Sequence, residues 1–187
     1  MVKRRAANHD RVWKLGQQAA RGCSQNFARE IEKTKKGITA YFIQKSLNCL
    51  PNFIGCLAEN QFSNLVITQF PTFVVANVDS YNMKGSHWIA IGIFKSSIEI
   101  FDPLGFTIFN WSRVPCSLLE FLHRMSVTRR VQVSPQIQSS HSQLCGFYCI
   151  FYLLLRSLTN MRKINSYFFL LNSKLSRNDN LLYNFFK

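Results

Sequence analysis

The stretch HWIAIGIFKSSIEIFDP, residues 87–103, carries a clear local structural signal. The seven residues after His87 are apolar or glycine and rich in isoleucine, and IEIF follows after a short Lys-Ser-Ser turn, which predicts a β-hairpin. Pro103 has no backbone N–H and cannot continue the ladder, so Asp102 stands where the second strand ends. Because hairpin strands are antiparallel, the start of one lies beside the end of the other. We therefore predict that His87 and Asp102 lie side by side.

A carboxylate beside an imidazole can accept its N–H and set which ring nitrogen carries the proton. The pair would then be a general base with an orienting group. Two ordinary interpretations stay open on spacing alone. A histidine in a strand is commonly a core or surface residue, and Asp102 is also the expected cap of an Asp-Pro turn.

A second apolar stretch begins at Cys145 and continues to residue 158, long enough for a buried helix. The polar residues 139–143 precede it. The N-terminus of a helix carries partial positive charge and free N–H groups, which stabilise a thiolate. Gly146 would allow close backbone approach beside the sulfur. Cys145 is therefore a candidate nucleophile, with a small core cysteine as the alternative.

A thiol protease also needs hydrogen-bond donors for the oxyanion. Gln138 lies seven positions before Cys145 and could supply a side-chain amide from the loop. Gln136 and Gln143 remain rivals on composition.

A zinc site is the competing interpretation of this segment. His141, Cys145 and Cys149 are spaced at i, i+4 and i+8, which would align them on a helix. Residues 139–143 are expected to form a loop, however, and no fourth ligand stands nearby. We therefore expect no metal.

The net charge of +14, from 23 Lys+Arg against 9 Asp+Glu, favours a polyanionic partner, most simply DNA. Residues 1–36 hold ten basic and three acidic side chains and are expected to be a basic N-terminal arm, flexible or helical. A protease domain would then occupy residues 37–187. The alternative is a basic surface that only aids solubility.

The six cysteines follow a charged N-terminus that lacks the apolar core of a secretory signal. We therefore expect an intracellular chain with reduced thiols, and no membrane association. Hydrophobic spacing predicts the remaining elements. The predicted helices cover 38–47, 117–125 and 167–186, the last with a polar gap at 173–180, and the predicted strands cover 70–78 and 127–133.

The motifs GSHW at 85–88, FDPLGF at 101–106 and QSSHSQLCGFYC at 138–149 follow one another in the order His, Asp, Gln, Cys. This order and the final Gln-to-Cys spacing resemble the adenovirus-type cysteine endopeptidases, the adenain family. Within it, the pattern is closest to protease homologues of Polinton/Maverick-type elements and large DNA viruses. FIGC at 53–56 and Asn-Asp at 178–179 also fit.

The resemblance covers about residues 38–186 and implies a role for each site residue. His87 would be the base, Asp102 its orienting group, Gln138 the oxyanion donor and Cys145 the nucleophile. It implies an α+β, papain-like fold with a central, mostly antiparallel sheet and the nucleophile at the start of a buried helix.

The resemblance also implies a cysteine endopeptidase that cleaves virion precursor proteins during particle maturation, in the host nucleus and the virion. Its chemistry would need no cofactor, with DNA and a peptide as candidate activators. Adenovirus enzymes carry glutamate where Asp102 stands. They also tether their peptide through a cysteine that the stretch near Val127 lacks.

Two alternatives remain. Ubiquitin- and SUMO-like deconjugases share the His, Asp, Gln, Cys order but more often have Asp-Cys-Gly where this chain has Leu-Cys-Gly. An inactive, basic DNA-packaging protein would explain the charge but not the tetrad.

Overall fold

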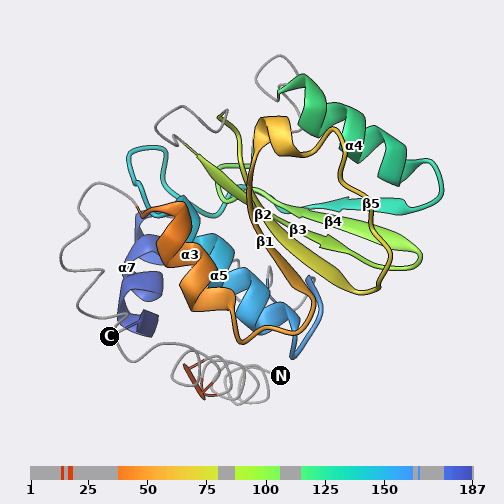
Figure 1. Ribbon diagram of the computed structural model, residues 1–187. Helices are drawn as coiled ribbons and strands as arrows, with labels where there is room; N and C mark the ends of the chain where they lie inside the picture. The colour runs from red at the N-terminus through yellow and green to blue at the C-terminus, as the bar shows by residue number, and fades with distance from the viewer. Residues whose placement is uncertain are drawn as a thin grey trace.

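The computed structural model describes residues 14, 17–18, 38–79, 87–105, 115–161, 164 and 175–186. The predicted N-terminal arm lies almost wholly outside these residues, as does the boundary at Gly37. The described residues form layers of helices around a single sheet (Figure 1).

The sheet has five strands in the order β1-β2-β3-β4-β5. The strands are β1 Phe53–Ala58, β2 Thr72–Asn77, β3 Trp88–Ile93, β4 Ser97–Phe101 and β5 Arg130–Val133. The central strands β2, β3 and β4 are antiparallel, whereas β1 pairs parallel with β2 and β4 parallel with β5. The sheet is thus mixed, because both outer connections are long crossovers and only crossovers can make neighbours parallel.

The hairpin predicted from residues 87–103 is confirmed. β3 and β4 pair from Ile93 with Ile98 to Ala90 with Phe101. All six residues of β3 are buried. This explains the nearly continuous apolar sequence, because a central strand covered on both faces cannot alternate with polar residues.

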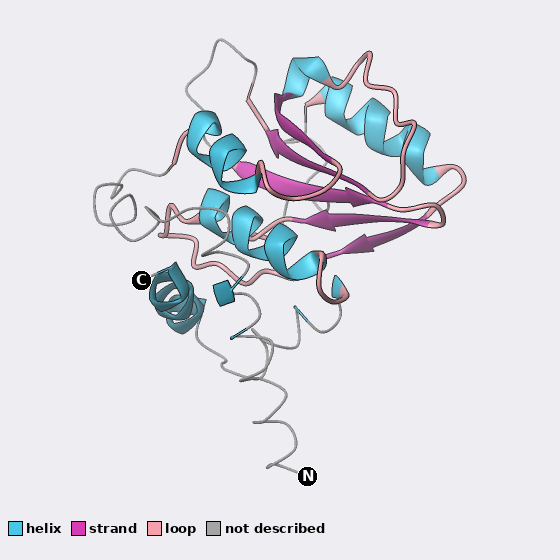
Figure 2. Cartoon of the chain, turned by 60° about the horizontal axis from the view of Figure 1, so that its bottom comes forward, coloured by secondary structure: helices cyan, strands magenta, loops and turns pink. Residues whose placement is uncertain are grey.

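Helices cover both faces of the sheet (Figure 2). One face carries α3 Ala40–Leu47, α5 Cys145–Arg156 and α7 Leu175–Phe186, and the other carries α4 Cys116–Ser126 and the short 3₁₀ helix η1 Glu59–Gln61. Alternate residues of β3 supply the two cores: Trp88 and Ala90 pack toward α5, and Ile89 and Ile91 pack toward α4. The α+β class expected from the sequence is confirmed.

Several elements differ from the sequence predictions. The strand β1 was not predicted, and its register shifts between Phe53 and Gly55. The strand β5 begins at Arg130 because residues 127–129 form the turn that follows α4. The polar gap expected at 173–180 is largely the first half of α7, and its Asn178 is buried. Residues 167–174 lie outside the described part.

Cys56, Cys116, Cys145 and Cys149 are free thiols. Cys49 is disulfide-bonded, so the expectation of reduced thiols is wrong for this cysteine. Among the residues that the structure places, no helix is long and apolar enough to cross a membrane.

Candidate active site

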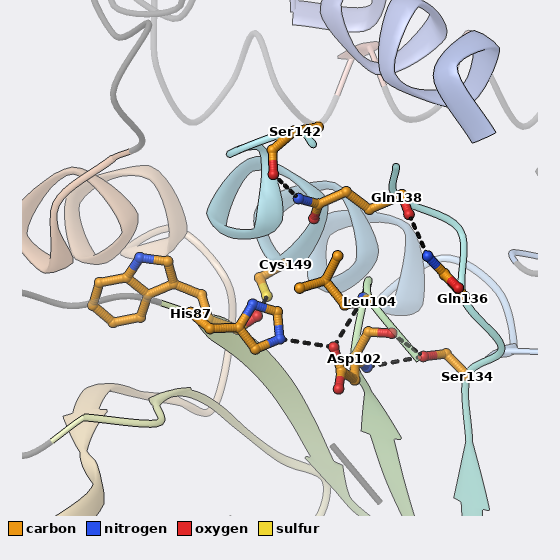
Figure 3. A network of polar contacts seen from close by, with 9 residues as sticks. His87, Asp102, Leu104, Ser134, Gln136, Gln138, Ser142 and Cys149 are labelled. Carbon is orange, nitrogen blue, oxygen red and sulfur yellow. Dashed lines mark hydrogen bonds and ion pairs between the residues drawn. The ribbon is translucent and has the colours of Figure 1, made fainter. Parts of the chain in front are cut away.

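His87 and Asp102 meet at one end of the β3–β4 hairpin, as the sequence predicted (Figure 3). His87 Nε2 lies 2.8 Å from Asp102 Oδ1, and both residues are buried. The hairpin register produces this contact. His87 immediately precedes β3 and Asp102 immediately follows β4. Because these neighbouring strands are antiparallel, both residues lie at the same end of the sheet.

The Asp102 carboxylate and backbone are held by further hydrogen bonds. Leu104 N donates to Oδ1 at 2.9 Å, so Asp102 caps its own turn as well as binding His87. Ser134 bridges the backbone of Asp102. Its Oγ accepts from Asp102 N at 2.8 Å and donates to Asp102 O at 2.9 Å. Ser134 was not found from the sequence, because a lone serine 32 positions away carries no local signal.

His87 also interacts with the thiol of Cys145. Burial lowers the pKa of His87, but the hydrogen bonds to Asp102 and Cys145 and the charges of both groups outweigh it and raise the pKa to about 9. Nε2 is engaged by Asp102, which leaves Nδ1 as the ring nitrogen for the sulfur. An imidazolium at neutral pH stabilises an adjacent thiolate.

Cys145 is the first residue of α5 and is buried. Its sulfur therefore sits at the end of the helix where partial positive charge and unpaired N–H groups gather. Cys149, one turn later, is in a different environment. Its thiol donates to Trp88 O at 3.3 Å, and burial, followed by the nearby Cys145 and Asp102, raises its pKa well above the ordinary value. Cys149 is thus held as a neutral thiol.

Gly146 has a steric role in packing that the sequence did not predict. A Cβ at this position would lie 2.6 Å from Ile38 Cγ1 and 3.2 Å from Ile43 Cδ1. The missing side chain therefore makes room for Ile38 and for α3 against the first turn of α5. The predicted backbone approach beside the sulfur stays a prediction.

Gln138 is the only buried member of the three glutamines considered from the sequence. Its Nε2 donates to Ser142 O at 2.7 Å, which leaves the second N–H of the amide for another acceptor. Within the described part of the chain, Oε1 has no hydrogen-bond partner. Gln136 and Gln143 are exposed, and Gln136 donates to Gln138 O at 3.1 Å.

His141 lies in an exposed turn before α5, so it does not share a helix with Cys145 and Cys149. No group of three His, Cys, Asp or Glu residues able to hold a metal ion occurs in the described ranges. The i, i+4, i+8 spacing therefore has no structural counterpart.

Comparison with known proteins shows similarity to a viral protease. No family model matches the chain. The chain is 31% identical over 120 residues to the protease of Bovine adenovirus C serotype 10. The aligned region covers 57% of this chain and 59% of that protease. The chain is similar to an adenovirus protease. This similarity confirms the resemblance drawn from the motifs, over somewhat less than two thirds of the relative's length.

Two solved structures show a distant overall similarity to the chain. The SUMO protease Ulp1, with its catalytic cysteine oxidised to a sulfinic acid, has a TM-score of 0.45 and 16% identity, covering 97% of this chain and 96% of that chain. HopZ1a in complex with IP6 and CoA has a TM-score of 0.47 and 10% identity. The match covers 91% of this chain and 60% of the HopZ1a chain. Both likenesses are distant.

Proposed function

We propose that this protein is a cysteine endopeptidase with Cys145 as nucleophile, His87 as general base and acid, and Asp102 as the group that orients the imidazole. The observation that supports this best is that one buried imidazole contacts both a carboxylate and the cysteine at the start of α5. Gln138 is the proposed side-chain donor to the oxyanion.

The chemistry follows from these contacts. The Cys145 thiolate adds to a peptide carbonyl, and the negative charge moves to the carbonyl oxygen, where the Gln138 amide and the first N–H groups of α5 donate. The intermediate collapses with cleavage of the C–N bond as His87 gives its proton to the leaving amine, which forms an acyl-enzyme. His87 then takes a proton from water, and hydroxide displaces Cys145. These residues suffice without a cofactor.

The proposed substrates are precursor proteins of a virus or virus-like element, cut during particle maturation in the host nucleus and the virion. Similarity to an adenovirus protease supports this substrate class, and the motif pattern supports a Polinton-type or large-DNA-virus relative. A peptide activator tethered through a cysteine near Val127 is not part of the proposal.

We further propose that DNA binds a basic surface made of Lys95, Arg124, Arg129 and Arg130. Arg129 Nε donates to Phe94 O and Arg130 N to Ser96 O, so the start of β5 lies beside the β3–β4 turn. Arg124 and Arg129 donate to neutral backbone carbonyls, which leaves their positive charge uncompensated by these contacts. The expected effect is to hold the enzyme near DNA-associated substrates.

Incubating the full-length protein with a peptide library and identifying the cleaved peptides tests the proposed peptidase activity. Cys145→Ala should abolish cleavage, whereas Cys149→Ala should retain most of it. Iodoacetamide labelling followed by peptide mapping should show Cys145 reacting fastest, with exposed Cys116 as the internal reference and Cys149 unlabelled in the folded protein. Full cleavage by Cys145→Ala would reject the assignment. Cleavage of ubiquitin-like fusions in preference to peptides would instead favour a deconjugase.

A further inference from the structure

The C-terminal helix α7 places polar side chains against the loop that carries Gln138. Asn178 is buried and Asp179 is half-buried, although the apolar residues of the same helix, Leu182, Phe185 and Phe186, already supply its packing. Burying polar groups is costly unless they are hydrogen-bonded, so their partners indicate what they do.

Asp179 binds the loop on one side of Gln138. Its carboxylate accepts from Tyr148 Oη at 2.8 Å and from the backbone of Ser139 and the side chain of Ser142. Ser142 N in turn donates to Ser139 O at 3.0 Å, which closes a tight turn. The carbonyl of Ser142 is the acceptor for Gln138 Nε2. Asp179 therefore fixes the acceptor that orients the Gln138 amide.

The backbone before Gln138 is held from two directions. Ile137 O accepts from Asn178 Nδ2 at 2.9 Å and from Tyr148 Oη at 3.4 Å. On the other side, Pro103 O accepts from both Ile137 N and Gln138 N, each at 2.9 Å. Pro103 follows Asp102 directly, so the loop is fixed between the turn that holds Asp102 and the helix α7.

We propose that Asn178, Asp179 and Tyr148 are positioning residues that set the direction of the Gln138 amide toward the oxyanion, and that α7 is thereby part of the active centre. This inference rests on the proposed peptidase function. The hydrogen bonds above join the three residues to the loop that carries Gln138. They should therefore affect stabilisation of the tetrahedral intermediate without affecting formation of the thiolate.

Two variants of the full chain test this. Tyr148→Phe removes one donor, and Asp179→Ala removes the acceptor for Tyr148, Ser139 and Ser142. We expect kcat to fall by about tenfold in the first and by up to about a hundredfold in the second, less than or similar to deletion of an oxyanion donor. KM, the rate of Cys145 alkylation by iodoacetamide and the pH profile of alkylation should stay unchanged. Asp179→Asn, which keeps one acceptor, should recover part of kcat.

Matched controls separate positioning from loss of packing. Tyr152→Phe also removes a buried hydroxyl from α5, but one that donates to Glu99 of β4 at 2.7 Å and not to the Gln138 loop or α7. Asn184→Ala changes an exposed residue of α7. Both controls should keep kcat even where Tyr152→Phe lowers the melting temperature as much as Tyr148→Phe does.

Two results would overturn the inference. One is an active wild type whose Tyr148→Phe and Asp179→Ala variants keep full kcat. The other is a fall in alkylation rate that parallels the fall in kcat, because the whole centre would then be disturbed. A wild type that cleaves no peptide would instead contradict the proposed peptidase function, and no variant would be needed to see it.

Discussion

The imidazole ring of His87 interacts with both other members of the proposed catalytic centre, Asp102 and Cys145. Its Nε2 is engaged by Asp102 at 2.8 Å, which directs Nδ1 to the thiol. A carboxylate with no exposed surface would be costly alone, but Asp102 Oδ1 also accepts from Leu104 N. The same side chain thus caps a turn and contacts the imidazole, which is the geometry that the proposed orienting role requires.

Asp102→Asn should lower kcat by roughly a hundredfold or more, because the amide can no longer balance the imidazolium or fix the tautomer. Glu99→Gln provides the comparison. Glu99 is buried on the same strand and bonds Tyr152 and Arg156, so its loss should lower stability and leave kcat nearly intact. Steady-state rates, normalised to the folded fraction, distinguish the two. Equal losses of kcat would contradict the orienting role.

The raised pKa of His87 predicts a pH dependence of stability. A folded-state pKa of about 9 against an ordinary 6.5 means that the folded protein binds this proton more tightly. The contribution is therefore fully present below about pH 6.5 and is lost as pH rises through about 9, with a size on the order of 1–3 kcal/mol. The difference in unfolding free energy between wild type and Asp102→Asn should shrink over that range. A difference that grows with pH would show the sign to be wrong.

The helices α3 and α5 interlock at Gly146. Ile38 and Ile43 occupy the space where a side chain at this position would lie, close to the residue that starts α5. The requirement is steric. Packing between elements thus requires glycine beside the proposed nucleophile.

Gly146→Ala should lower the unfolding free energy by about 1 kcal/mol, because overpacking outweighs the better helix propensity of alanine. In an Ile38→Ala background the closest contacts disappear and only Ile43 Cδ1, at 3.2 Å, remains, so the same change should cost less or become neutral. Denaturant unfolding of the four proteins in this cycle measures the sign. If the cost of Gly146→Ala is the same in both backgrounds, Ile38 is not the reason for the glycine.

Across the whole molecule, the proposed basic surface and the proposed active site lie at opposite ends of the central strands. His87 immediately precedes β3, and Lys95 follows it, so the six-residue strand separates them by about 20 Å. A nucleic acid bound at Lys95 would therefore reach the sulfur only indirectly. Localisation of the enzyme fits this distance better than direct participation in the chemistry.

DNA binding should weaken steeply with salt and show little sequence preference, since binding to phosphates releases counterions. The double variant Lys95→Gln/Arg130→Gln should reduce the slope of log affinity against log salt by about 1.8, at roughly 0.9 for each phosphate that is no longer neutralised. Lys45→Gln, an exposed change on α3, should reduce it less. Fluorescence anisotropy with a short duplex gives both slopes. If the double variant has the same slope of log affinity against log salt as the wild type, any DNA binding lies on another surface.

The hairpin and the helix after Cys145 could be predicted from the sequence because their signals are local. Apolar runs, a short polar turn and Pro103 all act within about a dozen residues, and so does the spacing of Gln138 from Cys145. The juxtaposition of His87 with Asp102 followed from hairpin geometry alone. These features needed no knowledge of the rest of the chain.

The surroundings of those residues depend on segments that are distant in the chain. Ser134 reaches Asp102 across 32 positions, and Asn178 reaches Ile137 across 41, from a segment that looked like a polar gap. The parallel edge strands and the steric role of Gly146 likewise depend on distant partners. The role of a buried polar side chain, or of a glycine, depends on the residues that it contacts. When those residues are far apart in the chain, no local pattern in the sequence reports the contact.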